Sequence, residues 1–116
     1  MEREFINLDI FNKLWEDLGL TDDDLRNLQE YLCINPESGK VIKNTGGVRK
    51  LRWTLRKKGK SGGIRILYID FLIYEKLYLL MVYPKSKKED ITEKEKKIIK
   101  NLVINLKNEL KGNKNE

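Results

Sequence analysis

The sequence contains no histidine and a single cysteine, which excludes several common kinds of catalytic site. Ser-His-Asp triads and other histidine-based acid–base pairs cannot form, and a zinc site would lack its usual ligands. The glycine pairs at 46–47 and 62–63 match neither a Walker phosphate loop nor a dinucleotide-binding fingerprint. Acidic residues such as Asp70 and Glu75 are too scattered to predict a magnesium site. We therefore expect neither a metal nor a cofactor.

The lone cysteine and the short apolar runs also indicate where in the cell the protein is located. Cys33 cannot form an internal disulfide, which favours the reducing cytoplasm, and its helical apolar surroundings predict a core side chain rather than a nucleophile. The N-terminus has no apolar stretch typical of a signal peptide. The longest apolar run, over residues 77–83, is far too short to span a membrane. We expect a cytoplasmic protein without a membrane partner.

The net charge of +6 is distributed unevenly along the chain. Residues 1–40 carry 4 basic and 10 acidic side chains, a net of −6, and residues 89–116 carry 7 and 6, a net of +1. Residues 41–88 carry 13 basic and only 2 acidic side chains, a net of +11. Such a concentration of positive charge is typical of proteins that bind a polyanion, and it predicts a nucleic-acid partner. The alternative is a basic surface that serves solubility alone.

Helical patterns flank this basic middle segment. Apolar residues recur at helical spacing over residues 9–18 and, after a threonine N-cap, over residues 21–35, so two helices should form a hairpin. A weak strand signal at 4–8 precedes them. A capping box opens a last helix over residues 92–111, and the glycine at 112 fits its end. We expect residues 112–116 to be a flexible tail.

The basic segment itself has the pattern of β-strands. Over residues 50–56, apolar and basic side chains alternate, which predicts a half-buried strand with a basic outer face. Near-continuous apolar runs at 64–71 and 77–83, joined by a short turn, predict central strands of an antiparallel meander, covered on both faces. A basic, glycine-rich loop at 57–63 precedes them. With no repeat or second domain in sight, we expect one α+β domain over residues 1–111.

Arginine, lysine and tyrosine remain to carry chemistry, and they gather on these strands and the loop. Arg65 interrupts an apolar strand near its start, while Tyr83 and Lys85 stand at the end of the next one. Since antiparallel neighbours run in opposite directions, Arg65 and the 83–88 segment should converge at one edge of the sheet. Further basic residues on the strand and the loop are Lys50, Arg52, Arg56, Lys57, Lys58 and Lys60.

Such a set suits RNA cleavage without a metal, by attack of the 2′-hydroxyl on the adjacent phosphorus. The protein must orient the sugar, neutralise charge on the phosphate and move two protons. Arginine binds phosphate through its bidentate fork, a lysine among other cations is suited to proton transfer, and tyrosine can stack on a base. Residue types alone leave a second interpretation open, a basic face that binds nucleic acid without cutting it.

Four stretches, in order and correctly spaced, resemble the HigB-like toxins of the RelE/ParE superfamily. Residues 46–53 (GGVRKLRW) resemble their GG-hydrophobic-RKLRW segment, and residues 59–68 (GKSGGIRILY) their GK-x-GG-x-R-x-x-Y segment. Residues 82–92 (VYPKSKKEDIT) resemble a VYxKxxxxDLT segment, and residues 35–42 (NPESGKVI) add a fourth match. The resemblance covers nearly the whole chain. Pro84 departs from it, because a small residue is commoner there.

The resemblance implies an α+β fold with an N-terminal helical hairpin, a twisted antiparallel sheet and a C-terminal helix. It implies a ribosome-dependent mRNA endonuclease that arrests growth and is inhibited by a cognate antitoxin, a HigA-like helix-turn-helix protein through which alone it would contact DNA. Arg65 would bind the phosphate, with Lys60, Tyr83 and Lys85 as the other catalytic residues. The RNA-binding residues would be Lys50, Arg52, Arg56, Lys57, Lys58, Lys87 and Lys88.

Two other functions stay open at this point. Gyrase poisons of the ParE type share the fold without cleaving RNA, although their usual sequence lacks so dense a set of basic residues. A nucleic-acid-binding regulator without catalytic activity is the third candidate. The sequence indicates neither a codon preference nor which lysine acts as acid or base.

Overall fold

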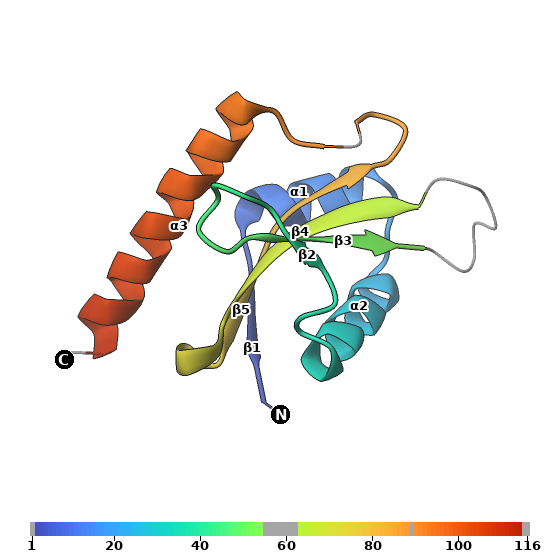
Figure 1. The fold of residues 1–116 in the computed structure, drawn as a ribbon. Helices are drawn as coiled ribbons and strands as arrows, with labels where there is room; N and C mark the ends of the chain where they lie inside the picture. Colours follow the sequence, from blue (N-terminus) through green and yellow to red (C-terminus); the bar gives the residue numbers. More distant parts are fainter. Residues whose placement is uncertain (1, 55–62, 89, 115–116) are drawn as a thin grey trace.

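The computed structural model describes residues 2–54, 63–88 and 90–114. Helices pack on both faces of a five-stranded sheet (Figure 1). The elements in chain order are β1 (Glu4–Asn7), α1 (Asp9–Asp17), α2 (Asp22–Ile34), β2 (Lys40–Val41), β3 (Arg49–Trp53), β4 (Ile64–Phe71), the short 3-10 helix η2 (Leu72–Tyr74), β5 (Lys76–Pro84) and α3 (Glu93–Lys114). The predicted α+β architecture, with its two N-terminal helices and C-terminal helix, is confirmed.

The sheet is mixed rather than wholly antiparallel. Its strand order is β1-β5-β4-β3-β2, and the four strands from β2 to β5 pair antiparallel as predicted. The opening strand β1 pairs parallel with β5, so the prediction of a purely antiparallel sheet is wrong at this edge. Residues 8–75 separate the two strands, and no hairpin turn therefore dictates their relative direction.

Two apolar clusters, one on each face of the sheet, form the core. On one face, Phe11 of α1 and Leu28 of α2 pack against inward residues of β4 and β5 such as Ile66. On the other face, Val103 of α3 packs against the alternate residues, such as Leu67. Because β4 and β5 are covered on both faces, nearly all of their residues are apolar, as their sequence pattern predicted.

The helix ends follow the predicted caps with one exception. Thr21 caps α2 through a capping box, and Thr92 caps α3, with its side chain accepting from the Glu95 amide at 3.1 Å. Gly112 does not end α3, which continues to Lys114. A glycine near a helix end costs only about 1 kcal/mol relative to alanine, so it does not force a stop. The single-domain boundary and the mobility of the tail stay predictions.

The Asn-Pro-x-x-Gly motif has a structural role on the α1–α2 face. The Tyr68 hydroxyl, in the middle of β4, donates to the Pro36 carbonyl and accepts from the Gly39 amide, both at 2.9 Å. A Cβ at Gly39 would lie 2.9 Å from the Tyr68 ring, so this close approach requires glycine. Burial raises the pKa of the Tyr68 phenol, which therefore keeps its proton and both bonds.

Candidate active site

Three predicted site residues form a row across three neighbouring strands. Arg65 of β4 lies opposite Arg52 of β3 on one side and opposite Tyr83 of β5 on the other. All three side chains lie on the α3 face, because the alternate residues of these strands belong to the α1–α2 cluster. The expected convergence of Arg65 with the end of β5 is thus confirmed. We call Arg52, Arg65 and Tyr83 the cationic row.

Lys85 continues the row beyond the end of β5. Its backbone amide donates to the Gly63 carbonyl at 3.2 Å, which ties the end of β5 to the start of β4. The Lys85 side chain is exposed, and Lys87, two residues further on in the same turn, is exposed as well. A Cβ at Gly63 would lie 2.4 Å from the Trp53 carbonyl oxygen, so only glycine fits at this point, where the end of β3 lies against the start of β4.

Burial differs sharply along the cationic row. Arg52 is exposed at the surface, whereas Arg65 is only 4% exposed and Tyr83 only 6%. An arginine keeps its charge even when it is buried, because the pKa of its guanidinium is so high. Arg65 therefore holds a permanent positive charge at a fixed place in the sheet, and Arg52 adds a second one at the surface beside it.

Two further predicted RNA-binding lysines have partners inside the molecule. Lys50 forms an ion pair with Asp90 at 2.5 Å, and only 15% of the Lys50 side chain is exposed. This contact is the largest cause that lowers the pKa of Asp90, and the charges of Lys96 and Arg52 add to it. Asp90 thus carries its negative charge against the basic face, and it ties the segment after β5 to β3.

Lys88 is likewise paired with a carboxylate, which belongs to α3. It forms an ion pair with Glu95, and its ammonium lies 5.3 Å from the centre of the Tyr83 ring, within reach of a cation–π contact. The sequence predicted a capping box at the start of this helix but gave no indication of the contact between Glu95 and Lys88. The remaining predicted residues, Arg56, Lys57, Lys58 and Lys60, lie outside the described residues.

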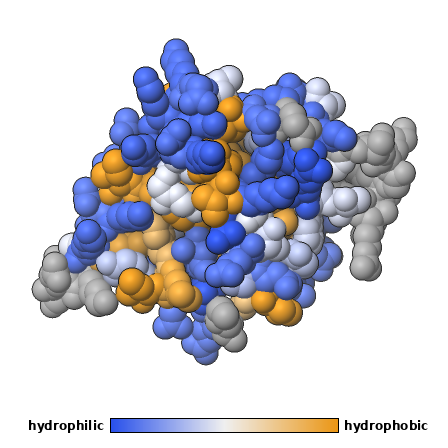
Figure 2. All heavy atoms as spheres, viewed as in Figure 1, coloured by the Kyte–Doolittle hydropathy of each residue, from blue (hydrophilic) through white to orange (hydrophobic). Residues whose placement is uncertain are grey.

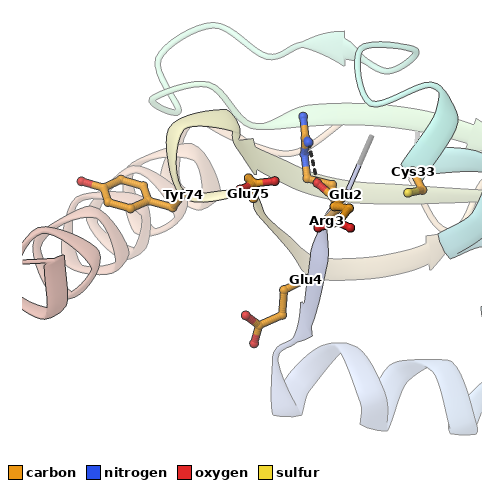
Figure 3. Close-up of a pocket in the computed structure, with 6 residues that line it drawn as sticks. All are labelled: Glu2, Arg3, Glu4, Cys33, Tyr74 and Glu75. Atoms are coloured by element: carbon orange, nitrogen blue, oxygen red, sulfur yellow. Dashed lines mark hydrogen bonds between the residues drawn. The ribbon is translucent and has the colours of Figure 1, made fainter.

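A pocket of about 510 Å³ lies at the opposite end of the sheet (Figure 3). Its position follows from the pairing of Glu4 with Lys76 at the start of β5, whereas Tyr83 is near the end of that strand. Cys33 borders the pocket and is half-buried, so the prediction of a core cysteine is wrong. The lining residues are Glu2, Arg3, Glu4, Cys33, Tyr74 and Glu75.

The described residues form neither a metal site nor a membrane-spanning helix. In the described ranges, no group of three or more cysteine and acidic side chains is arranged to hold a metal ion. Among the helices of those same ranges, none has both the length and the apolar character needed to cross a membrane. The cationic row with its neighbouring lysines is therefore the candidate active site.

Comparisons with known proteins agree with this fold. A mutant of the E. coli toxin RelE in the free state has a similar structure, with a TM-score of 0.55 and 17% sequence identity over 77% of this chain and 90% of that one. At this identity the similarity shows the fold. Residues 7–113 match the family described as the RelE toxin of the RelE / RelB toxin-antitoxin system. Because the match spans most of the sequence, the chain belongs to the RelE toxin family.

Proposed function

We propose that this RelE-family toxin is a ribosome-dependent mRNA endonuclease that needs no metal for the cleavage step. The observation that carries the proposal is the cationic row, in which a buried arginine lies between a second arginine and a tyrosine on adjacent strands. This arrangement offers a rigid phosphate site with a proton-bearing and stacking group next to it. The exposed Lys85 stands where the row ends.

The proposed reaction is attack of an RNA 2′-hydroxyl on the adjacent phosphorus. The 2′-oxygen forms a bond to phosphorus while the bond to the 5′-oxygen breaks, which leaves a 2′,3′-cyclic phosphate and a new 5′-hydroxyl. Arg65 binds the non-bridging oxygens and neutralises the charge that grows on them. Lys85 and Lys60 serve as proton donor and acceptor, and Tyr83 stacks on a base or relays a proton.

The ribosome is the proposed source of substrate positioning. In-line attack needs the sugar and the phosphate held in one geometry, which contributes a large part of such a rate enhancement. The described basic face provides charges for the backbone, such as Arg52 and Lys87, but its lysines 50 and 88 are already paired with carboxylates. A flexible RNA alone would therefore be bound loosely, and a translating ribosome would present it in a fixed conformation.

The family pairs each toxin with an antitoxin, and we propose that this chain has one too. A HigA-like helix-turn-helix protein encoded nearby is the specific candidate, and contact with DNA would occur only in that complex. Expression of the toxin alone in the cytoplasm should arrest growth, and co-expression with the neighbouring gene should restore it. Failure of the two proteins to form a complex would contradict this part of the proposal.

The decisive experiment compares naked mRNA with mRNA on translating ribosomes. Cleavage should occur only on ribosomes, at constant magnesium because ribosomes require that ion. Efficient cutting of naked RNA, or activity that depends on an added transition metal, would overturn the mechanism. Trapped gyrase–DNA complexes without mRNA cleavage would favour the ParE-type alternative, and retardation of DNA by the free toxin would favour the regulator.

A further inference from the structure

The first turn of α3 is connected to the cationic row through Glu95 and Lys88. The Oε1 atom of Glu95 accepts a hydrogen bond from the Thr92 amide at 2.8 Å, which completes the capping box of the helix. The other carboxylate oxygen, Oε2, accepts from the Lys88 ammonium. That ammonium lies 5.3 Å from the centre of the Tyr83 ring, and Tyr83 is the neighbour of Arg65 in the sheet.

The contact between Glu95 and Lys88 is partly sheltered from solvent. Their side chains are 34% and 31% exposed, so the pair is screened less than one fully in water. The Lys88 bond, followed by the Thr92 amide, lowers the pKa of Glu95, which therefore remains ionised at neutral pH. Because its carboxylate is fixed by the helix backbone, Glu95 restricts where the long Lys88 side chain can place its charge.

Resting on the proposed function, we propose that Glu95 is a positioning residue of the site, acting through Lys88. It holds the Lys88 ammonium on the Tyr83 ring, and this contact restricts the ring beside the phosphate bound at Arg65. The same carboxylate caps α3, so the start of the helix and the cationic row form one unit. Glu95 itself need not touch RNA to influence the rate of cleavage.

The substitution Glu95→Gln separates the two roles of this side chain. Glutamine also closes a capping box, but it lacks the charge that holds Lys88. On translating ribosomes, kcat should fall by roughly three- to tenfold with KM for ribosomes unchanged, because ring placement matters in the reacting complex. In the free protein with ¹³C-labelled tyrosine, the Tyr83 ring resonance, assigned with Tyr83→Phe, should shift.

Glu93→Gln is the matched control, because it removes the same charge from the same helical turn. Glu93 pairs with Lys96 at 3.1 Å and is 79% exposed. The control should leave both kcat and the Tyr83 resonance as in the wild type. If Glu95→Gln behaves like this control, or if it slows cleavage without moving the Tyr83 resonance, the positioning role is overturned.

Lys88→Met tests the same link without touching the cap of α3. If Glu95 acts through Lys88, the Lys88→Met and Glu95→Gln double variant should be no slower than the slower single variant. If the decreases in kcat of the two single variants multiplied in the double variant, the inference would be overturned. If Glu95→Gln did not fold, Lys88→Met alone would decide the test. A wild-type protein that cleaves nothing on ribosomes would refute the proposed function, while the tyrosine resonance would still test the Glu95 link.

Discussion

The two ends of the sheet each bury an arginine, but its neighbours differ. At the end that carries the pocket, Arg3 donates to the Asp70 carboxylate from Nε at 2.6 Å and from Nη2 at 3.0 Å, with 2% of its side chain exposed. At the other end, Arg65 is also buried but lies between Arg52 and Tyr83. Burial alone therefore does not show what role an arginine has in this fold.

The neighbours decide what each guanidinium can do. Asp70 raises the pKa of Arg3 and takes up the fork of the guanidinium in a bidentate pair. That pair connects the segment before β1 to the end of β4, across β5. Arg65 lies beside the second positive charge of Arg52, and the two together raise the positive potential at this end of the sheet. Figure 2 shows that hydrophilic side chains dominate the visible face, with apolar groups scattered between them.

The largest effect should come from removing the buried cation of the cationic row. Arg65→Ala should lower mRNA cleavage on ribosomes by about 10²–10³-fold, as loss of one preorganised charge contact to a transition state does. The fold should persist, and growth arrest should disappear. Arg26→Ala, which removes an equal charge from an exposed position of α2, should leave cleavage unchanged. An Arg65→Ala variant that arrests growth normally would show that the site is wrongly assigned.

Substitution of the buried arginine at the opposite end, Arg3, should lower stability and leave activity unchanged. Arg3→Met should lower the free energy of unfolding by about 2 to 3 kcal/mol, since Asp70 loses two charge-assisted hydrogen bonds at a poorly hydrated position. Urea unfolding measures the loss, and cleavage per folded molecule should match the wild type. If Arg3→Met instead abolished cleavage in the folded protein, the assignment of a structural role to Arg3 and a catalytic role to Arg65 would be wrong.

The register of the cationic row could be predicted from the sequence, whereas the partners of several charged residues could not. Arg65 and Tyr83 were identified because strands with continuous apolar runs have a regular register, so one charged residue in such a run is conspicuous. The pairings of Arg3 with Asp70 and of Lys50 with Asp90 join residues that are 67 and 40 positions apart. Local patterns contain no information on such contacts. The parallel pairing of β1 was missed for the same reason.

A smaller effect on ribosome binding should distinguish substitutions on the two faces of β3. Arg52→Gln should weaken ribosome binding modestly and reduce the salt dependence of log Kd by about one unit of slope, as expected when one phosphate contact is lost. Arg49 lies on the opposite face and donates to the Glu37 and Gly39 carbonyls. Arg49→Gln should leave the salt slope unchanged while it lowers stability. Equal slopes for the two variants would contradict a one-sided RNA face.

The smallest expected effect is the contribution of Glu95 to the free energy of unfolding, which should be lost at acidic pH. The pKa of Glu95 in the folded protein lies below its ordinary value of 4.5, chiefly because of the Lys88 bond. Its contribution to stability is therefore fully present above that ordinary value, and it is lost as the pH falls through the lower folded pKa. For a pair exposed to this degree the contribution is under about 1 kcal/mol.

Glu95→Gln should remove this acid-dependent contribution. The variant should be less stable than the wild type at neutral pH, and the difference should shrink as the pH is lowered below 4.5 and the carboxylate of the wild type takes up its proton. Urea unfolding at several pH values measures both curves. Glu93→Gln serves again as the control, because Glu93 pairs with Lys96 rather than with Lys88. A stability difference that is constant with pH would mean that Glu95 acts through packing rather than through its charge.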